Sequence, residues 1–360
     1  MSLSTKTEHD QLRDAVRRWV AITCPSDAVR AAEGTAAAPY DRASWVRGCR
    51  EIGLSGLLAP SEIGGAETGL AEVAVAIEEL AAGLSGAPLL STVLAMDAML
   101  LAEDAPWHTL GVNLLEGNAI IGFDLGTHHA DIVLSDGGAT GMLSTVLDGP
   151  GATMIVALTD AGLIIVPADA RGVDITQIDG LDLTRRTACV RLTNAPYDFH
   201  PLPADGLQRL ADHRRVLLAA DALGLMRGAL AMVADYAKIR VAFGRLMGSF
   251  QGVKHQLADI YCTVELCEAV VRAAIAEQDE HGPDGHKLAL VAQRLVIPSA
   301  VRVTTECLRL LGGIGYTWEH DAHLYVRRAH ANVALAGPQG VARDQLADIL
   351  ELKCQNLTEK

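Results

Sequence analysis

The sequence is short of basic residues and has no long uninterrupted apolar run, and both shortages exclude classes of partner. Lys and Arg number 30 against 44 Asp and Glu, so the formal net charge is −14. This balance argues against nucleic acid or an anionic membrane as a partner, because both are bound through basic patches. The apolar stretch at residues 216–234 is interrupted by Asp221 and Arg227. It therefore predicts a buried helix and not a membrane span.

Paired cysteines and an apolar leader are also missing. Seven cysteines occur without a Cys-x-x-Cys pair, which predicts reduced thiols with neither a disulfide framework nor a zinc site. The first ten residues carry charges where the centre of a secretory signal would be apolar, so we expect no signal peptide. These features predict a cytoplasmic protein without a metal site.

The chain has enough apolar residues to form the cores of two or three domains, since 50% of its 360 residues are hydrophobic. Residues 8–115 show helical spacing, and the helix expected at 71–80 should carry its acids on the outside. Helical spacing returns after residue 203. The helical spacing is interrupted by dipeptides in which Gly stands next to Phe, Pro or another Gly. These dipeptides are at residues 243–244, 282–283, 312–313 and 337–338.

The intervening segment has a different period. Short β-rich runs lie at residues 119–123, 153–158, 163–166 and 187–192. Turn sequences such as Asp136-Gly-Gly bound them, which is typical of a small β domain. The fold expected is mainly α with a central β domain: an N-terminal helical domain at 1–115, a β-barrel or β-sandwich at 116–202, and a C-terminal helical bundle at 203–360.

Two motifs in the last domain are specific. The first reads Tyr236-Ala-Lys-Ile-Arg240-Val-Ala-Phe243-Gly244-Arg and continues to Phe250-Gln251. The second reads Gly312-Gly313-Ile-Gly315-Tyr316-Thr-Trp318-Glu319-His. At this spacing the chain resembles the acyl-CoA dehydrogenases, flavoenzymes that oxidise the α,β carbons of an acyl-CoA thioester.

The resemblance implies FAD as cofactor and several of its contacts. Residues matching Arg240, Phe243 and Gln251 contact an FAD that lies mostly in a neighbouring subunit. A guanidinium fork suits a diphosphate, although Arg240 could instead cap a helix end and Phe243 could belong to the core. The glycines at 312 and 313 would let backbone approach the adenine. The family's usual glutamine three residues earlier is Arg309, which cannot accept a hydrogen bond.

The family's catalytic position is different here. Counting without a gap from Tyr316, the glutamate that removes the α-proton is replaced by Ala336, which has no proton acceptor. The alternative position for this base, on the first long helix of the bundle, is occupied by Arg214. Asp221 lies seven residues further along that helix, on roughly the same face. It could be a relocated base, but a buried Asp paired with an Arg is the commoner arrangement.

The β domain also departs from the family. Residues 122–131 read Gly-Phe-Asp-Leu-Gly-Thr-His-His-Ala-Asp, and no tryptophan occurs between Trp107 and Trp318. The motifs that surround a chain's own flavin ring are thus missing. Within this stretch His128, His129 and Asp131 have only loose metal-ligand spacing, and a solvated turn is the favoured interpretation.

The resemblance therefore favours a degenerate subunit of a heteromeric, FAD-dependent acyl-CoA dehydrogenase. The expected partner is a homologous subunit in an α2β2 tetramer, which would bring the base and bind most of the acyl-CoA, with an electron-transfer flavoprotein as acceptor. A sterol side chain is a candidate substrate, because two-gene enzymes of this kind occur in actinobacterial sterol breakdown. Two alternatives stay open: a homomeric enzyme that uses Asp221 as base, and a scaffold protein without flavin.

Overall fold

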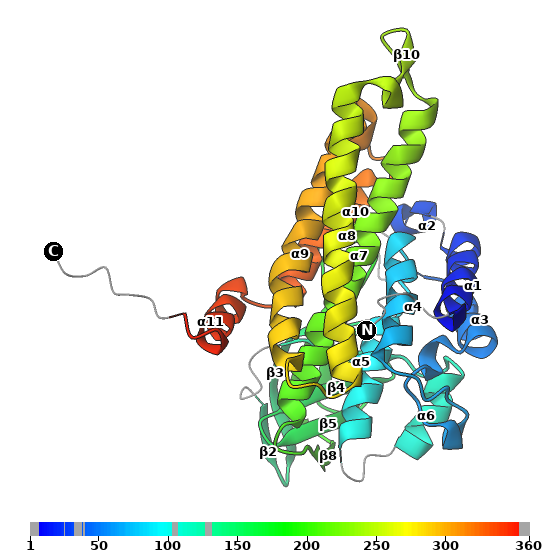
Figure 1. The fold of residues 1–360 in the computed structure, drawn as a ribbon. Coiled ribbons are helices and arrows are strands. Elements are labelled where there is room, and N and C mark those ends of the chain that lie inside the picture. Colours follow the sequence, from blue (N-terminus) through cyan, green and yellow to red (C-terminus); the bar gives the residue numbers. More distant parts are fainter. Residues whose placement is uncertain are drawn as a thin grey trace, which may run out of the picture.

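Long helices form most of the molecule, and a sheet of short strands lies at one end of them (Figure 1). The computed structural model describes residues 7–24, 26–31, 38, 40–102, 107–126 and 132–352. The described elements follow the expected order of helices, strands and helices along the chain. The fold is therefore mainly α with a central β domain, as the sequence predicts.

The N-terminal part packs around α4 and α5. Its described helices are α1 (Thr7–Thr23), α2 (Ser26–Ala31), α3 (Arg42–Ile52), α4 (Leu70–Ala82), α5 (Leu89–Leu101) and α6 (Trp107–Leu115), with 3-10 turns η1 (Leu54–Gly56) and η2 (Ser61–Ile63). The carboxylate of Asp279, from the bundle, accepts hydrogen bonds from the backbone N–H groups of Leu70 (2.7 Å) and Ala71 (3.1 Å). A side chain distant in sequence thus satisfies the first donors of α4.

One expectation for α4 is wrong. Glu78 and Glu79 are 1% and 7% exposed, not on the outer face. The helix packs against α7 so closely that a Cβ on Gly224 would lie 2.2 Å from the carbonyl oxygen of Glu78. Burial of both carboxylates requires compensating cations, and arginines from neighbouring helices supply them.

The β domain is one eight-stranded sheet. Its strands are β1 (Ile121–Asp124), β2 (Ile132–Ser135), β3 (Gly138–Leu147), β4 (Met154–Thr159), β5 (Gly162–Pro167), β6 (Val173–Ile178), β7 (Thr187–Ala195) and β8 (Asp198–Pro201). The order is β6-β7-β3-β1-β4-β5-β8, with β2 paired to β3. Ser135 pairs with Gly138, so Asp136 and Gly137 form the two-residue turn of a hairpin.

The C-terminal helices form a bundle. They are α7 (Gly206–Ile239), α8 (Gln251–Asp279), α9 (Gly285–Leu310), α10 (Ala322–Leu335) and α11 (Gln339–Ile349), with two short strands, β9 (Val241–Ala242) and β10 (Arg245–Leu246), and 3-10 turns η4 (Met247–Ser249) and η5 (Gly312–Tyr316). The predicted breaks fall between these helices. By length and composition α7 and α9 could span a membrane, but 72% of the apolar window of α7 is buried inside the protein, as in a soluble bundle core.

Candidate functional site

A hairpin at the far end of α7 and α8 presents the first motif (Figure 1). Strands β9 and β10 are joined by Phe243 and Gly244, whose φ angles are +52° and +78°. Positive φ at both central positions is what a type I′ turn requires. Gly244 adopts it freely, whereas Phe243 is held in a region that side chains rarely occupy. Its side chain is nevertheless 96% exposed, so burial within the described part of the chain does not compensate for this conformation.

Arg240 lies at the base of the hairpin, where α7 ends. Its carbonyl oxygen accepts a hydrogen bond from the Met247 N–H at 2.7 Å, which closes the hairpin. Its exposed guanidinium has no hydrogen bond or ion pair within the described residues. The side chain therefore does not cap the carbonyls of α7, and its five donors face outward.

Gln251 is the first residue of α8 and is exposed. It follows Phe250, whose ring lies 6.4 Å from that of Phe243 in an edge-to-face arrangement. The guanidinium of Arg245 lies 3.9 Å above the ring of Phe250. The hairpin and the N-terminus of α8 thus present aromatic faces and cations together, a combination suited to a planar anionic ligand.

The second motif lies at the same end of the bundle, because α9 runs antiparallel to α8. Gly312 has φ +69° and begins η5, directly after α9 ends. A Cβ added to Gly312 or Gly313 would meet nothing within 4 Å. Arg309 lies on an exposed face and lines a cleft of about 530 Å³ between α8 and α9, with Arg302, Glu306, Asp259 and Thr263 among the other lining residues.

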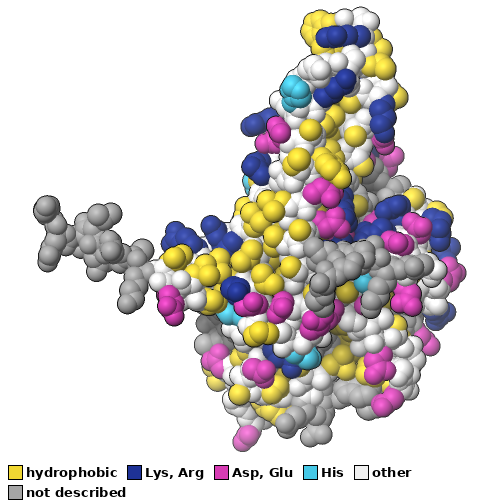
Figure 2. All heavy atoms as spheres, viewed as in Figure 1, with side chains coloured by type: hydrophobic (Ala, Val, Ile, Leu, Met, Phe, Trp, Pro, Cys, Tyr) yellow, Lys and Arg dark blue, Asp and Glu magenta, His cyan; other side chains and the backbone are white. Residues whose placement is uncertain are grey.

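This end of the molecule is also rich in exposed apolar side chains. Phe243, Tyr316 and Ile239 are 96%, 67% and 76% exposed. Figure 2 shows hydrophobic and basic side chains together over this end. Further exposed apolar residues are Val241, Leu246, Tyr261, Leu266, Ile314 and Trp318. An apolar surface of this extent on a monomer is typical of a subunit interface.

Ala336 lies far from this end, at the C-terminus of α10, and is 4% exposed. Its N–H donates to the carbonyl oxygen of Asn332 at 2.9 Å. Its own carbonyl accepts from the side-chain amide of Gln293 at 2.7 Å. The backbone is fixed by these bonds, while the side chain offers only a methyl group. No proton acceptor projects from this position.

Asp221 is buried on α7 beside Arg328 and Asn332 of α10, the helix that ends at Ala336, and both of its oxygens are engaged. One oxygen accepts from Arg328; the other accepts from Arg328 Nε at 3.2 Å and from Asn332 Nδ2 at 2.6 Å. Arg185 lies 3.8 Å away. Burial opposes ionisation of this carboxyl, but Arg328 and Arg185 outweigh it and hold the pKa of Asp221 below its ordinary value. A carboxylate in this state is a poor proton acceptor.

The same network joins all three parts of the chain. Arg328 donates to the carbonyl oxygen of Ser85 at 2.7 Å and to Thr184 Oγ1 at 3.1 Å. Arg185 donates to Asp182 at 2.8 Å and to Asn332 Oδ1 at 2.7 Å. The turn after α4, the loop before β7, and helices α7 and α10 therefore meet at this ionic cluster.

Arg214 connects α7 with the end of β1. Its Nη1 donates to the carbonyl oxygen of Leu125 at 2.9 Å. Burial, together with the neighbouring Arg215, lowers its pKa to about 10. Burial likewise raises the pKa of Asp124 to about 6, against the opposing effects of the Gly126 N–H and Arg214. A cation thus occupies the position that the resemblance gives to the alternative base.

The described residues contain no group of three His, Cys, Asp or Glu side chains able to hold a metal ion. His128, His129 and Asp131 lie outside the described residues.

Comparisons with known proteins identify the family. A sequence model of the acyl-CoA dehydrogenase N-terminal domain matches residues 6–103, and one of the C-terminal domain matches residues 206–351. The chain is 34% identical over 346 residues to the acyl-CoA dehydrogenase IpdE2 of Mycobacterium tuberculosis, across 96% of this chain and 98% of that protein. The chain belongs to the acyl-CoA dehydrogenase family.

Solved structures agree with this assignment. A variant of the Tcur3481–Tcur3483 steroid acyl-CoA dehydrogenase superposes with a TM-score of 0.86 at 26% identity, covering 96% of this chain and 98% of that one. The ChsE4–ChsE5 complex of Mycobacterium tuberculosis has the same fold, with a TM-score of 0.87 at 24% identity over 98% and 100% of the two chains.

Acyl-CoA dehydrogenases are FAD-dependent oxidoreductases, and the described residues fit one half of an FAD site better than the other. Arg240, Phe243 and Gln251 are exposed and free to contact a cofactor held by another chain. In contrast, we find no tryptophan among the β-domain residues. The resemblance gives such a residue to the pocket for a chain's own flavin ring.

The ionic cluster around Asp221 was not predicted in full. Arg328, Asn332 and Ala336 follow one another at intervals of four residues, so they share a helix face. That spacing is visible in the sequence. The contribution of Arg185 is not, because it comes from a loop more than 140 residues away in the chain.

Proposed function

We propose that this chain is the subunit of a heteromeric acyl-CoA dehydrogenase that completes the FAD site of a homologous partner and supplies no catalytic base. The observation that carries the proposal is the contrast between two regions. The residues that match FAD contacts, at one end of the bundle, are exposed to solvent. The two positions at which the family carries its catalytic base are occupied by Ala336 and Arg214.

The exposed end suits a cofactor that another chain holds. The guanidinium of Arg240 can form charge-assisted bonds to a diphosphate. The ring of Phe243 can pack on the cofactor, and Gly312 and Gly313 leave room for adenine to approach the backbone. The strained φ of Phe243 supports this role, because such strain is commonly retained where function requires it.

Catalysis must then depend on the partner's residues. When bound, FAD accepts the hydride from the β-carbon of the acyl-CoA while a base takes the α-proton. In this chain Ala336 offers no acceptor, Arg214 is a cation, and both oxygens of Asp221 are occupied by Arg328 and Asn332. The partner would supply the base and most of the acyl-CoA pocket.

A steroid-derived acyl-CoA is the substrate class we propose. The support is the 26% identity over almost the whole chain to a component of the Tcur3481–Tcur3483 steroid enzyme, which itself combines two proteins. We place the complex in the cytoplasm, as an α2β2 tetramer that passes electrons to an electron-transfer flavoprotein.

The role of Arg240 tests the proposal. Arg240→Ala in this chain, co-purified with a wild-type partner, is expected to lower FAD affinity about ten- to hundredfold, since a charge-assisted hydrogen bond contributes about 1.5–3 kcal/mol. Arg240→Lys is expected to restore it partly, because lysine keeps the charge but not the fork. FAD occupancy is measured by absorbance after dilution.

Lys238→Ala is the matched control. Lys238 is exposed two residues earlier, and among the described residues it pairs with Asp235 alone, at 2.7 Å. The Lys238→Ala substitution should leave the flavin content of the complex unchanged. If the Arg240→Ala complex assembles and keeps all its flavin at low concentration, Arg240 makes no cofactor contact and the proposal loses its main support.

A further inference from the structure

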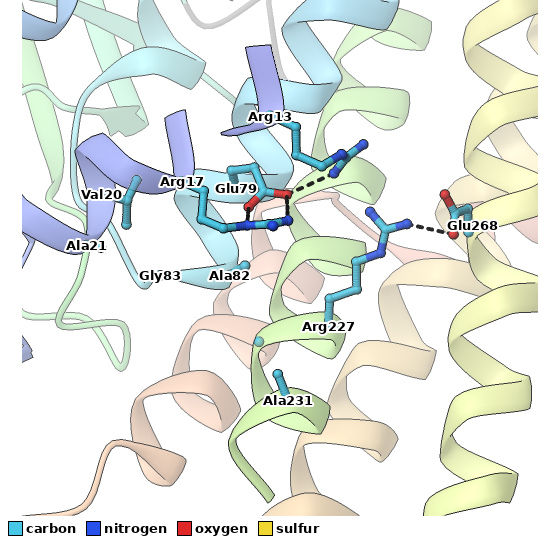
Figure 3. A pocket seen from close by; sticks show the side chains of 11 residues that line it. Arg13, Arg17, Val20, Ala21, Glu79, Ala82, Gly83, Arg227, Ala231 and Glu268 are labelled. Atoms are coloured by element: carbon cyan, nitrogen blue, oxygen red, sulfur yellow. Dashed lines mark hydrogen bonds and ion pairs between the residues drawn. The ribbon is translucent and has the colours of Figure 1, made fainter. Parts of the chain in front are cut away.

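A second cleft lies on the opposite flank of the bundle, away from the cofactor residues. It has a volume of about 590 Å³ and opens between helices α1, α4, α7 and α8 (Figure 3). Its charged lining residues are Arg13, Arg17, Glu79, Arg227 and Glu268. The remaining lining is almost all small: Val20, Ala21, Ala82, Gly83, Gly228 and Ala231. The space is kept open because few side chains extend into it.

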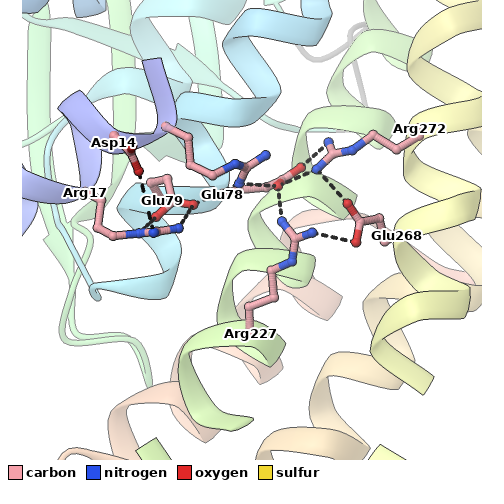
Figure 4. Close-up of polar contacts among 8 residues, drawn as sticks. Asp14, Arg17, Glu78, Glu79, Arg227, Glu268 and Arg272 are labelled. Atoms are coloured by element: carbon pink, nitrogen blue, oxygen red, sulfur yellow. Dashed lines mark hydrogen bonds and ion pairs between the residues drawn. The ribbon is translucent and has the colours of Figure 1, made fainter. Parts of the chain in front are cut away.

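Behind the cleft a buried carboxylate organises the arginines (Figure 4). Glu78, 1% exposed, accepts from Arg227 at 2.6 Å and from both terminal nitrogens of Arg272, and weakly from Arg13 at 3.4 Å. Glu268 accepts from Arg227 at 2.6 Å. These contacts orient the guanidinium groups toward one another from three different helices.

At the mouth of the cleft Glu79 is shared by two arginines. Arg13 Nη1 donates to it at 2.8 Å, and Arg17 donates through Nε at 3.0 Å and Nη2 at 3.2 Å. Arg17 is 60% exposed, and its remaining nitrogen, Nη1, lies 3.8 Å from the exposed carboxylate of Asp14. Arg13 uses only Nη1 in these contacts, so within the described part of the chain its Nε and Nη2 are left for another acceptor.

Donors exceed acceptors in this cluster. Four guanidinium groups carry about twenty N–H donors, whereas the four carboxylates around them, with Asp14 included, accept about sixteen hydrogen bonds. Arg272 Nε is buried and has no partner in the described part of the chain. The charges of the cluster balance, because the four guanidinium groups face four carboxylates once Asp14 is counted (Figure 4); the excess lies in the donors. A ligand that only accepts hydrogen bonds would complement the excess of donors, and a negative charge on it would strengthen its bonds to the guanidinium groups.

We propose that this cleft binds a phosphate group, with Arg13 and Arg17 as its main donors and Arg227 on the facing wall. Phosphate presents only acceptor oxygens, and arginine forks match its geometry. The small residues of the floor would admit the body of a phosphate ester, so free phosphate and a nucleotide are two sources of the same chemistry. The site is separate from the proposed FAD contacts and does not depend on them.

Isothermal titration calorimetry of the full chain with inorganic phosphate, at constant ionic strength, tests the proposal. Arg17→Gln is the variant of choice, because Arg17 is largely exposed and its loss should not unfold the protein. We expect it to weaken phosphate binding about ten- to hundredfold. Arg343→Gln is the control, since Arg343 is exposed on α11 and, where the structure describes the chain, pairs with Asp344 alone.

A second variant predicts a change of the opposite sign. Glu79→Gln removes the carboxylate that competes for Arg13 and Arg17, so it is expected to tighten phosphate binding. AMP binding with the same dependence on Arg17 would identify the ligand as a phosphate ester. Absence of saturable binding by the wild-type chain, equal binding of acetate, or equal weakening by Arg343→Gln would each overturn the proposal.

Discussion

At the residue scale, the central question is whether any acidic side chain near Ala336 can act as a base. Asp221 is the acid that sequence reasoning singles out, and its two oxygens accept from Arg328 and Asn332. Its low pKa and its burial fit an ion-pair role, in which the carboxylate neutralises two arginines that would otherwise be buried without compensation.

Asp221→Asn in the active complex is therefore expected to leave turnover within a few-fold of wild type while lowering stability. Removing one partner of a buried ion pair typically costs about 3–5 kcal/mol, and urea unfolding of the variant measures this loss. A general base contributes about 10²–10⁴-fold to the rate. A fall in turnover on that scale with stability retained would make Asp221 catalytic.

Asp148 gives a pH-dependent prediction. This buried residue follows β3, has φ +57°, and accepts a hydrogen bond from Ser91 on α5 at 2.6 Å. Burial raises its pKa to about 6, although Ser91 and nearby arginines act in the opposite direction. The folded protein thus binds this proton more tightly than the unfolded chain between about pH 4 and pH 6. The stability contributed by the protonated group is lost as the pH rises through 6.

Asp148→Asn removes this titration and keeps the backbone, because asparagine tolerates positive φ. The free energy of unfolding of the wild type, relative to the variant, is expected to fall by up to about 3 kcal/mol between pH 4 and pH 7, from a shift of about two units at about 1.4 kcal/mol each. Parallel pH profiles for the two proteins would show that Asp148 does not titrate in this range.

At the element scale, the breaks between helices could be predicted because Gly and Pro act locally. The ends of α7, α9 and α10 lie beside Phe243-Gly244, Gly312-Gly313 and Gly337-Pro338. Half of the sheet was not predicted. Strands β2, β3, β6 and β8 are short or rich in Gly, Thr and Asp, and they are stabilised by pairing with strands distant in sequence, which a local pattern does not reveal.

In the hairpin of β9 and β10, the cost of the strained Phe243 backbone to stability can be compared with the contribution of its ring to flavin binding. Phe243→Asn gives the Asn-Gly pair that type I′ turns favour. It should stabilise the isolated chain by about 1 kcal/mol, since a bulky residue in the left-handed region costs about 1–2 kcal/mol. The same change should lower flavin occupancy in the complex. Thermal unfolding and flavin absorbance measure the two effects separately.

Phe243→Ala separates the ring from the strain. It removes the aromatic face but keeps a Cβ in the left-handed region, so flavin occupancy should fall without a gain in stability. Full flavin occupancy in both variants would mean that the ring makes no contact with the cofactor.

At the scale of the whole molecule, the two sequence motifs predicted the family. The helical spacing on either side of the β-rich segment predicted the mainly α fold. The sequence favoured a buried Asp221 paired with an arginine, which the structure confirms, but it revealed neither which arginines pair with it nor the cluster around Glu78. Glu78 is neutralised by Arg227 and Arg272 from helices α7 and α8. Asp221 is neutralised by Arg328 from α10 and, at longer range, by Arg185 from the β domain. Both clusters depend on long-range packing, which is why Glu78 and Glu79, expected on the outer face of α4, are buried instead.

The complete chain thus presents an exposed apolar and basic end, while its interior near Ala336 is filled by ion pairs. This distribution favours a subunit that contributes to a neighbour's cofactor site over an enzyme that acts alone. A scaffold without flavin would not explain why Arg240, which has no side-chain partner among the described residues, lies beside a strained, exposed Phe243.

Flavin content and dehydrogenase activity, measured for the chain purified alone and co-purified with its homologous partner, test this account most directly. Alone, the chain is expected to be colourless and to reduce no electron acceptor with any acyl-CoA. With the partner, the complex should be yellow and active, with one FAD for each pair of unlike chains. A yellow, homomeric and active preparation of this chain by itself would contradict the account.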